Sequence, residues 1–195
     1  VKLGGLSNIT ATAVEGFPKP GQWAQADLVV FFLTQNSLTD SQYALIDSHL
    51  KAGKSIIVLH QGLVQRKRTD DWADRIGYAF SWDKNNRSKW GQFENPITLN
   101  THHPILQHFP PVITFKDEFY WNLQKGTLGT ITVLGTCRAP VNKEVSDKKW
   151  PVLWTVEHGK VGDAKRGRVF CVVIGHFNDM QSNPLYRTLI LRGMA

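Results

Sequence analysis

Two histidines stand directly after apolar runs that are typical of buried strands. His60 follows residues 55–59 (SIIVL) and precedes Gln61 and Gly62, while His176 follows residues 168–175 (RVFCVVIG). In open α/β sheets, ligands bind just beyond the carboxyl ends of the strands. We therefore expect both histidines to take part in chemistry, although each could instead be a hydrogen-bonded structural histidine.

Two pairs of adjacent polar residues could add further groups to such a site: His102 and His103, and Asp117 and Glu118. Adjacent residues of an extended segment point to opposite faces, so only one member of each pair can face a given site. Imidazole and carboxylate together suit a divalent metal, proton transfer, or recognition of sugar hydroxyls. The alternatives are that one histidine of the first pair caps a helix while the other is exposed to solvent, and that the carboxylates form structural ion pairs.

The chain also has seven tryptophans, of which Trp82, Trp90 and Trp121 lie nearest to polar stretches. An aromatic ring can stack on the apolar C–H face of a sugar ring, so these three are candidates for a carbohydrate site. Ordinary core packing is the alternative for each of them.

The elements that must position these side chains follow from hydrophobic patterning. A strand over residues 26–33, a helix over residues 40–50 and a strand over residues 55–60 form a βαβ unit with parallel strands. Thr39 and Gln42 predict a capping box at the start of that helix. We expect a weak strand at 10–14, a helix at 70–80, strands at 96–99, 112–120, 130–137, 150–156 and 167–174, a polar loop at 139–149, and a last helix from Asn183 that buries Leu185, Leu189 and Ile190. The pattern predicts one α/β domain over residues 1–195 with a mostly parallel sheet and extra antiparallel strands.

Composition and charge limit the kinds of partner that this protein is expected to bind. The formal net charge is +7, but the basic residues are scattered, and the one tight cluster, residues 66–68 (RKR), is followed by Asp70 and Asp71. We therefore expect no nucleic-acid partner, although this cluster could attract an anionic or sugar-phosphate ligand. No apolar run is long enough for a membrane span, so we expect a soluble protein of the cytoplasm or periplasm. Cys137 and Cys171 lie within apolar runs and are expected to be buried free thiols.

A series of short segments in a fixed order resembles the ThuA-like, or trehalose-utilisation, family. The segments are residues 26–32 (ADLVVFF), 52–54 (AGK), 57–60 (IVLH), 103–105 (HPI), 117–120 (DEFY), 151–154 (PVLW), 167–170 (GRVF), 175–176 (GH) and 191–193 (LRG). The resemblance implies a class I glutamine amidotransferase-like fold, which is a flavodoxin-like three-layer arrangement. Such folds usually open with a central strand; here we expect that strand to be very weak or to lie outside this sequence.

The resemblance also implies a departure from amidotransferase chemistry. That superfamily keeps a cysteine nucleophile at a strand-to-helix elbow and a histidine after a late strand. In this sequence His60 stands at the elbow, His176 matches the late histidine, and Asn178 stands where the superfamily has its acid. Glutamine hydrolysis by a thiolate is therefore not expected.

Together, these observations predict a protein that acts on a disaccharide such as trehalose or on a keto-sugar. The residues expected to be catalytic are His60, His176 and Glu118; those expected to bind substrate are Gln61, His103, Asp117, Tyr120 and Trp121. If a divalent metal is bound, its ligands would be His60, His103, Glu118 and His176, and the ion zinc, manganese or iron. The alternative is a non-catalytic module that binds carbohydrate or protein, and homo-oligomer formation stays open.

Overall fold

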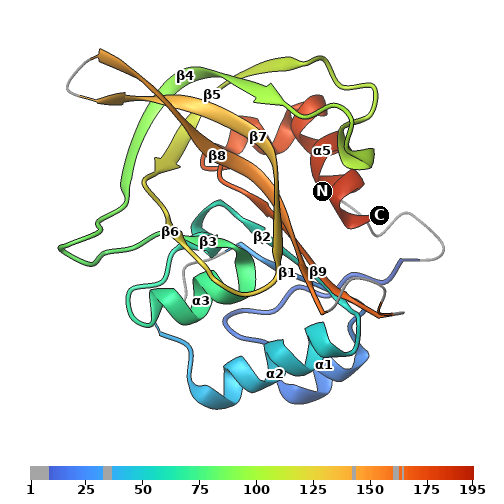
Figure 1. The fold of residues 1–195 in the computed structure, drawn as a ribbon. Helices are drawn as coiled ribbons and strands as arrows, with labels where there is room; N and C mark the ends of the chain where they lie inside the picture. Colours follow the sequence, from blue (N-terminus) through green and yellow to red (C-terminus); the bar gives the residue numbers. More distant parts are fainter. Residues whose placement is uncertain (1–8, 33–36, 142–143, 160–162, 164) are drawn as a thin grey trace.

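The computed structural model describes residues 9–32, 37–141, 144–159, 163 and 165–195. Its core is a seven-stranded sheet of order β1-β2-β9-β8-β7-β4-β5 (Figure 1). The strands are β1 (Leu28–Phe31), β2 (Ser55–Leu59), β4 (Lys89–Leu99), β5 (Val112–Trp121), β7 (Thr130–Val141), β8 (Glu144–His158) and β9 (Gly167–Val172). Strands β3 (Tyr78–Ala79) and β6 (Gln124–Lys125) form a separate antiparallel pair.

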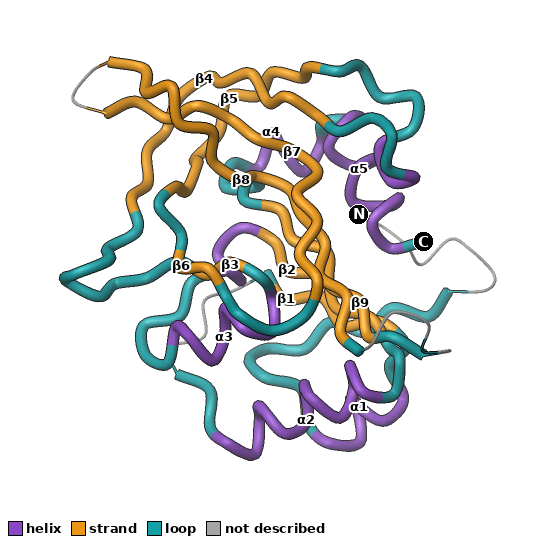
Figure 2. Tube along the Cα trace, viewed as in Figure 1, coloured by secondary structure: helices purple, strands orange, loops and turns teal. Residues whose placement is uncertain are grey.

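The sheet is mixed. Strand β2 pairs in parallel with β1 on one side and with β9 on the other. The remaining neighbours, from β9 through β8, β7 and β4 to β5, pair antiparallel. The α/β class and the parallel βαβ half are confirmed, but the antiparallel part is larger than the sequence indicated, and in Figure 2 its long strands curl away from β1 and β2.

The βαβ unit forms as its sequence predicts. Helix α2 (Asp40–Lys51) begins after Thr39, whose side chain accepts a hydrogen bond from the Gln42 amide, while the Gln42 side chain accepts one from the Thr39 amide. This capping box satisfies two backbone donors at the helix start. Ile46 and Leu50 are buried, so α2 packs its apolar side toward the sheet and returns the chain to β2.

Helices cover both faces of β9, the strand that leads to His176. The Cys171 thiol donates to the Ile76 carbonyl at the end of helix α3 (Thr69–Ile76), 3.4 Å away. The neighbouring Phe170 ring points the other way and packs so closely on Gly193 of helix α5 (Pro184–Met194) that a side chain there would clash. The remaining helices are α1 (Pro20–Gln25), α4 (Asn178–Ser182) and the 3-10 turns η1 (His60–Leu63) and η2 (Pro104–Leu106).

Several element predictions were wrong. Residues 10–14 form no strand, and helix α1 was not expected. Strand β4 begins at Lys89 rather than at 96, and β7 and β8 continue into residues 139–149, where a loop was expected. In both cases backbone pairing with a neighbouring strand holds polar residues that carry no hydrophobic pattern. Leu185 is exposed, whereas Leu189 and Ile190 are buried as predicted.

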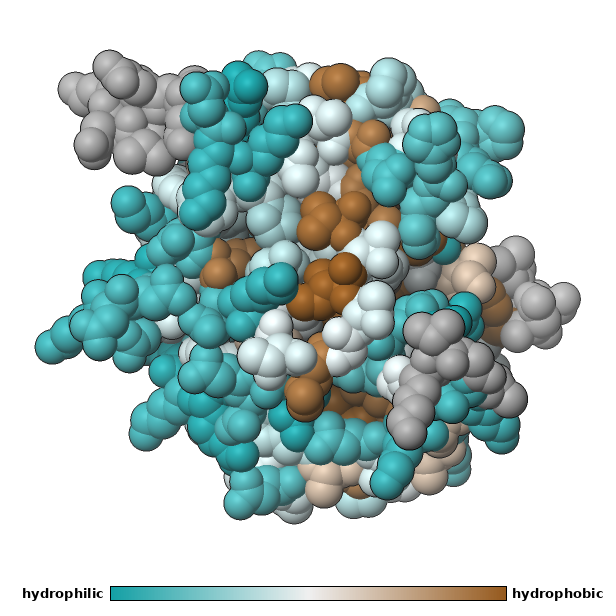
Figure 3. Space-filling view, viewed as in Figure 1, coloured by the Kyte–Doolittle hydropathy of each residue, from teal (hydrophilic) through white to brown (hydrophobic). Residues whose placement is uncertain are grey.

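The face of the molecule seen in Figure 3 is largely hydrophilic. In the space-filling view the apolar side chains of this face gather in a run over its middle, and hydrophilic side chains cover most of the rest (Figure 3). No helix within the described residues is long and apolar enough to span a membrane.

Candidate functional site

His60 occupies a tight turn between β2 and η1. Its backbone has a φ of +43°, in the left-handed region that non-glycine residues seldom adopt. Two residues later, a Cβ on Gly62 would lie 2.6 Å from the Phe31 carbonyl oxygen, so only glycine fits there. The turn is thus sterically fixed, and the imidazole it carries is almost completely buried, with 1% of the residue exposed.

Hydrogen bonds fix the tautomer of His60. Its Nδ1 lies 2.6 Å from the Val173 carbonyl oxygen, which can only accept, so Nδ1 carries the proton. Burial lowers the pKa of His60 below its ordinary value, against the opposing effects of that carbonyl and of Glu118. In the resulting neutral ring, Nε2 presents its lone pair and accepts a hydrogen bond from the Tyr120 hydroxyl at 3.1 Å.

The three residues predicted to be catalytic meet at this lone pair. Nε2 of His60 lies 3.0 Å from Nδ1 of His176 and 3.6 Å from Oε1 of Glu118, and the last two atoms are 3.7 Å apart. Glu118 is itself oriented by Gln92, whose side-chain amide donates to Oε2 over 3.4 Å. Two imidazole nitrogens and one carboxylate oxygen therefore converge on one point, an arrangement able to hold a metal ion.

Asp117 and Trp121 were predicted to bind substrate, but neither lines the cavity beside the cluster. Along β5, Glu118 and Tyr120 share one face, so Asp117 and Trp121 point to the other. Asp117 is fully buried, and its carboxylate accepts hydrogen bonds from the backbone amides of Glu118, Gly175 and His176 at 2.6, 2.9 and 3.0 Å. Asp117 therefore holds the backbone of Gly175 and His176 in place.

His103 was predicted as a metal ligand and a substrate-binding residue, and the structure does not bring it to the cluster. It precedes η2, and its Nδ1 accepts a hydrogen bond from the Ile105 amide. His102, its neighbour, is exposed. The alternative interpretation of this pair, one helix cap and one solvent-exposed histidine, is thus confirmed.

The cluster opens into a cavity of about 280 Å³. Gln61 and Tyr120, both predicted to bind substrate, line it together with Glu118 and His176. Its other lining residues are Val64, Arg66, Phe80, Trp82 and Trp90. Of these, Trp82 and Trp90 had been identified as sugar-stacking candidates, and both rings are exposed enough to be reached by a ligand.

Gln92 and the apolar pair Val64 and Phe80 were not found from the sequence. Gln92 lies opposite Glu118 in the β4–β5 register. It belongs to the polar first half of β4, which was not predicted to be a strand. Phe80 forms an isolated bridge with Val64, a contact that no local pattern indicates.

The family model of ThuA, described as trehalose utilisation, matches residues 4–195. The chain belongs to the ThuA family. No curated protein matches.

Solved structures agree with this ThuA assignment. A ThuA-like protein from Parabacteroides merdae has a TM-score of 0.69 at 16% identity, covering 95% of this chain and 76% of that one. A protein described as cytoplasmic, from Salmonella typhimurium, has a TM-score of 0.57 at 13% identity, with coverages of 92% and 75%. A protein from Thermoplasma acidophilum, described as a candidate component of GMP synthase, has a TM-score of 0.51 at 9% identity, with coverages of 90% and 74%. At these identities the likeness is one of fold.

Proposed function

We propose that this ThuA family member is an enzyme of carbohydrate utilisation whose centre is a divalent metal ion bound by His60, Glu118 and His176. The observation that carries the proposal is the triangle of 3.0, 3.6 and 3.7 Å formed by Nε2, Nδ1 and Oε1 of these residues. Atoms bound about 2.0–2.2 Å from one ion lie roughly 3.0–3.6 Å apart, so the triangle needs little adjustment to close on a metal.

The surroundings of His60 also suit a metal ligand. A coordinating histidine generally donates its second ring N–H to a carbonyl or carboxylate, which fixes the ring and raises its basicity. Val173 provides such an acceptor at 2.6 Å. Two imidazoles and one carboxylate on one side of an ion leave its other positions free for water or sugar oxygens and favour zinc, manganese or iron.

The cavity fits a carbohydrate substrate. The exposed ring of Trp90 offers a face for stacking, Trp82 borders the same cavity, and Gln61 can hydrogen-bond to sugar hydroxyls. The Tyr120 hydroxyl stands beside the proposed ion, where it can donate a hydrogen bond to a sugar oxygen or to developing negative charge. We propose a disaccharide such as trehalose, or a keto derivative of one, as the substrate.

Thiol-dependent glutaminase activity is not part of this proposal. Burial raises the pKa of the Cys137 thiol to about 12 and that of Cys171 well above its ordinary value, so neither supplies a thiolate nucleophile. We nevertheless propose a common three-layer, flavodoxin-like ancestry with the amidotransferases. The helices on both faces of β9 and the fold likeness to the GMP synthase component support it.

The test is metal binding by purified protein. Apo-protein is titrated with Zn²⁺, Mn²⁺ and Fe²⁺, and bound metal is measured by mass spectrometry for wild type, Glu118→Gln and His176→Ala. We expect one ion per chain and at least a tenfold loss of affinity in both variants. His103→Ala is the matched control, because the structure places this histidine elsewhere, and it should bind like wild type. Equal affinities for wild type, Glu118→Gln and His176→Ala would contradict the metal centre.

A second candidate is a non-catalytic carbohydrate-binding module, which the exposed Trp82 and Trp90 rings beside an open cavity favour. A panel of disaccharides and their keto forms separates the two functions. An enzyme turns over at least one of these sugars, and His176→Ala abolishes turnover while retaining affinity for it. A module binds the sugar without turnover, and Trp90→Ala then removes the affinity.

A further inference from the structure

A second, larger cavity lies next to the proposed metal site. It has a volume of about 530 Å³ and shares two of its lining residues, Arg66 and Trp82, with the site cavity. A ligand bound beside the His60–Glu118–His176 cluster can therefore extend past Arg66 and Trp82 into the larger cavity.

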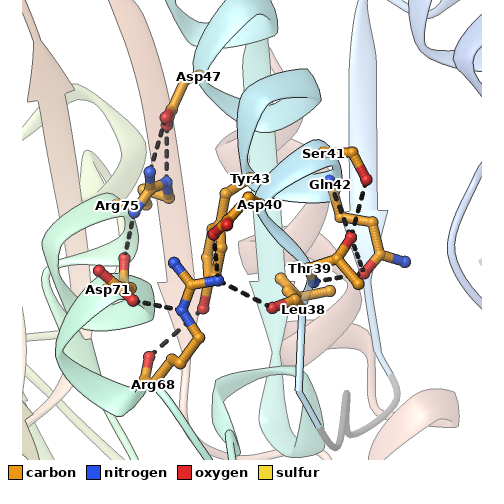
Figure 4. A network of polar contacts seen from close by, with 10 residues as sticks. All are labelled: Leu38, Thr39, Asp40, Ser41, Gln42, Tyr43, Asp47, Arg68, Asp71 and Arg75. Carbon is orange, nitrogen blue, oxygen red and sulfur yellow. Dashed lines mark hydrogen bonds and ion pairs between the residues drawn. The ribbon is translucent and has the colours of Figure 1, made fainter.

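The chain on both sides of Arg66 is anchored. On one side the Phe80 amide donates to the Leu63 carbonyl, and Val64 bridges to Phe80. On the other, the Arg68 guanidinium binds Asp40 and Asp71 at 2.6 Å each and lies 4.6 Å from the centre of the Tyr43 ring (Figure 4). The charge of Arg68 is thus already matched, whereas the exposed Arg66 between these anchors forms no ion pair within the described residues.

Arg87 approaches the same tryptophan from a closed loop. The Ser81 amide donates to the Ser88 hydroxyl and the Ser88 amide to the Ser81 carbonyl, each over 2.9 Å, which ties together the two ends of residues 81–88. Inside this loop, the guanidinium of Arg87 lies 5.2 Å from the Trp82 ring centre, and that of Arg66 lies 6.0 Å from it. Two guanidinium groups that take part in none of the ion pairs among the described residues therefore stand at one aromatic ring.

A positive charge stands where the two cavities meet. The larger cavity is lined by Arg66, Lys67 and Arg68 and by the carboxylates of Asp70 and Asp83; because Arg68 is already matched by Asp40 and Asp71, the remaining lining charges are two positive and two negative. Of these five, only Arg66 also lines the site cavity. A guanidinium binds a phosphate or carboxylate group through paired N–H donors, a geometry that a neutral sugar hydroxyl cannot match.

We propose that the substrate is an anionic carbohydrate whose phosphate ester or carboxylate is bound by Arg66, with Arg87 adding positive charge beside Trp82, while its sugar ring stacks on the exposed ring of Trp90 in the site cavity. The proposal rests on the proposed function, because it assigns the other end of the substrate to the His60–Glu118–His176 centre. It specifies the substrate class: a sugar that carries an oxyanion group.

The experiment is calorimetric titration of the metal-loaded protein with glucose, glucose 6-phosphate and glucuronate. We expect at least one anionic sugar to bind about 10- to 100-fold more tightly than glucose, the range of a charge-assisted hydrogen bond. Arg66→Gln should remove most of this preference without changing glucose affinity, and Arg87→Gln should remove a smaller part of it. Arg187→Gln, which removes an exposed charge on α5, is the matched control and should bind like wild type.

The outcomes distinguish a phosphate ester from a carboxylate and show which of the two proposals, the anion site or the metal centre, fails. Tighter binding of glucose 6-phosphate identifies a phosphate ester, and tighter binding of glucuronate identifies a carboxylate. Equal affinity for glucose and both anionic sugars, or an equal loss in Arg66→Gln and Arg187→Gln, would overturn the proposal. Metal affinity, measured in parallel, should be unchanged in Arg66→Gln. An Arg66-dependent preference in a protein that binds no metal would overturn the metal centre alone and support the anion site.

Discussion

Replacing Asp117 by Asn tests whether this buried carboxylate holds the backbone of the site residues in position. The change is nearly isosteric and removes the negative charge. In the structure Oδ1 accepts from the amides of Glu118 and His176, and Oδ2 accepts from that of Gly175. An asparagine carbonyl can keep the first two bonds, but its NH₂ group would face the Gly175 N–H, which then has no acceptor.

The expected cost follows from these three bonds. A hydrogen bond to a charged group contributes about 1.5–3 kcal/mol, and a buried donor left without a partner costs about 1–3 kcal/mol. Losing the bond to Gly175 and weakening the two others should lower the free energy of unfolding by roughly 2–4 kcal/mol. Because Gly175 and His176 are held by the same carboxylate, the His176 ring should also lose its fixed position, and metal affinity should fall.

Urea denaturation followed by tryptophan fluorescence measures the first effect, and titration with Zn²⁺ measures the second. Asp147→Asn is the control, because this carboxylate is 99% exposed and faces Arg138 at 3.6 Å, where an ion pair contributes little. It should change stability by less than about 0.5 kcal/mol. If Asp117→Asn also unfolds within that margin of wild type and binds Zn²⁺ equally well, the positioning role is refuted.

Two further predictions concern the His60 turn. Burial lowers the pKa of His60 below that of the unfolded chain, about 6.5, so as the pH falls the unfolded state takes up this proton first. The contribution of His60 to the free energy of unfolding should therefore be fully present above that pH and decline below it, by up to about 1.4 kcal/mol per pH unit. In urea titrations at decreasing pH, His60→Gln should show a shallower decline in stability than the exposed-site control His102→Gln. Gly62→Ala should lower the free energy of unfolding by about 1–3 kcal/mol, since its Cβ would meet the Phe31 carbonyl. Gly21→Ala, in open space on α1, should be neutral or slightly stabilising, and an equal effect of the two substitutions would contradict the steric argument.

The polar residues at the ends of the predicted strands indicated where the site lies. His60 and His176 could be placed together because parallel neighbouring strands finish at the same edge of the sheet, and β2 and β9 are such neighbours. The alternation rule left open which of Asp117 and Glu118 faces the site, since residues 117–121 of β5 are buried on both faces. Only the three-dimensional structure shows that Glu118 reaches the histidines and that Asp117 accepts hydrogen bonds from backbone amides.

Contacts between residues that are distant in sequence, and that no local sequence pattern marks, were not predicted. His103 looked like a ligand because imidazole is a common one, but its position is decided by a 3-10 turn that it caps through the Ile105 amide. The polar first half of β4, which brings Gln92 to Glu118, is held by pairing with β5 and has no hydrophobic alternation of its own. Such segments become strands through their partners, which are distant in sequence.

The left-handed backbone of His60 links the fold to the proposed chemistry. A non-glycine residue at a φ of +43° costs about 1 kcal/mol or more, and such strain persists only where the surrounding structure enforces it. Here Gly62 against Phe31 and the Val173 carbonyl on Nδ1 do so. A relaxed turn would leave the ring free to rotate, whereas this one holds the Nε2 lone pair toward Glu118 and His176. The strain thus supports preorganisation of a binding centre over a purely structural histidine, because a structural role could be met by a ring at an unstrained position.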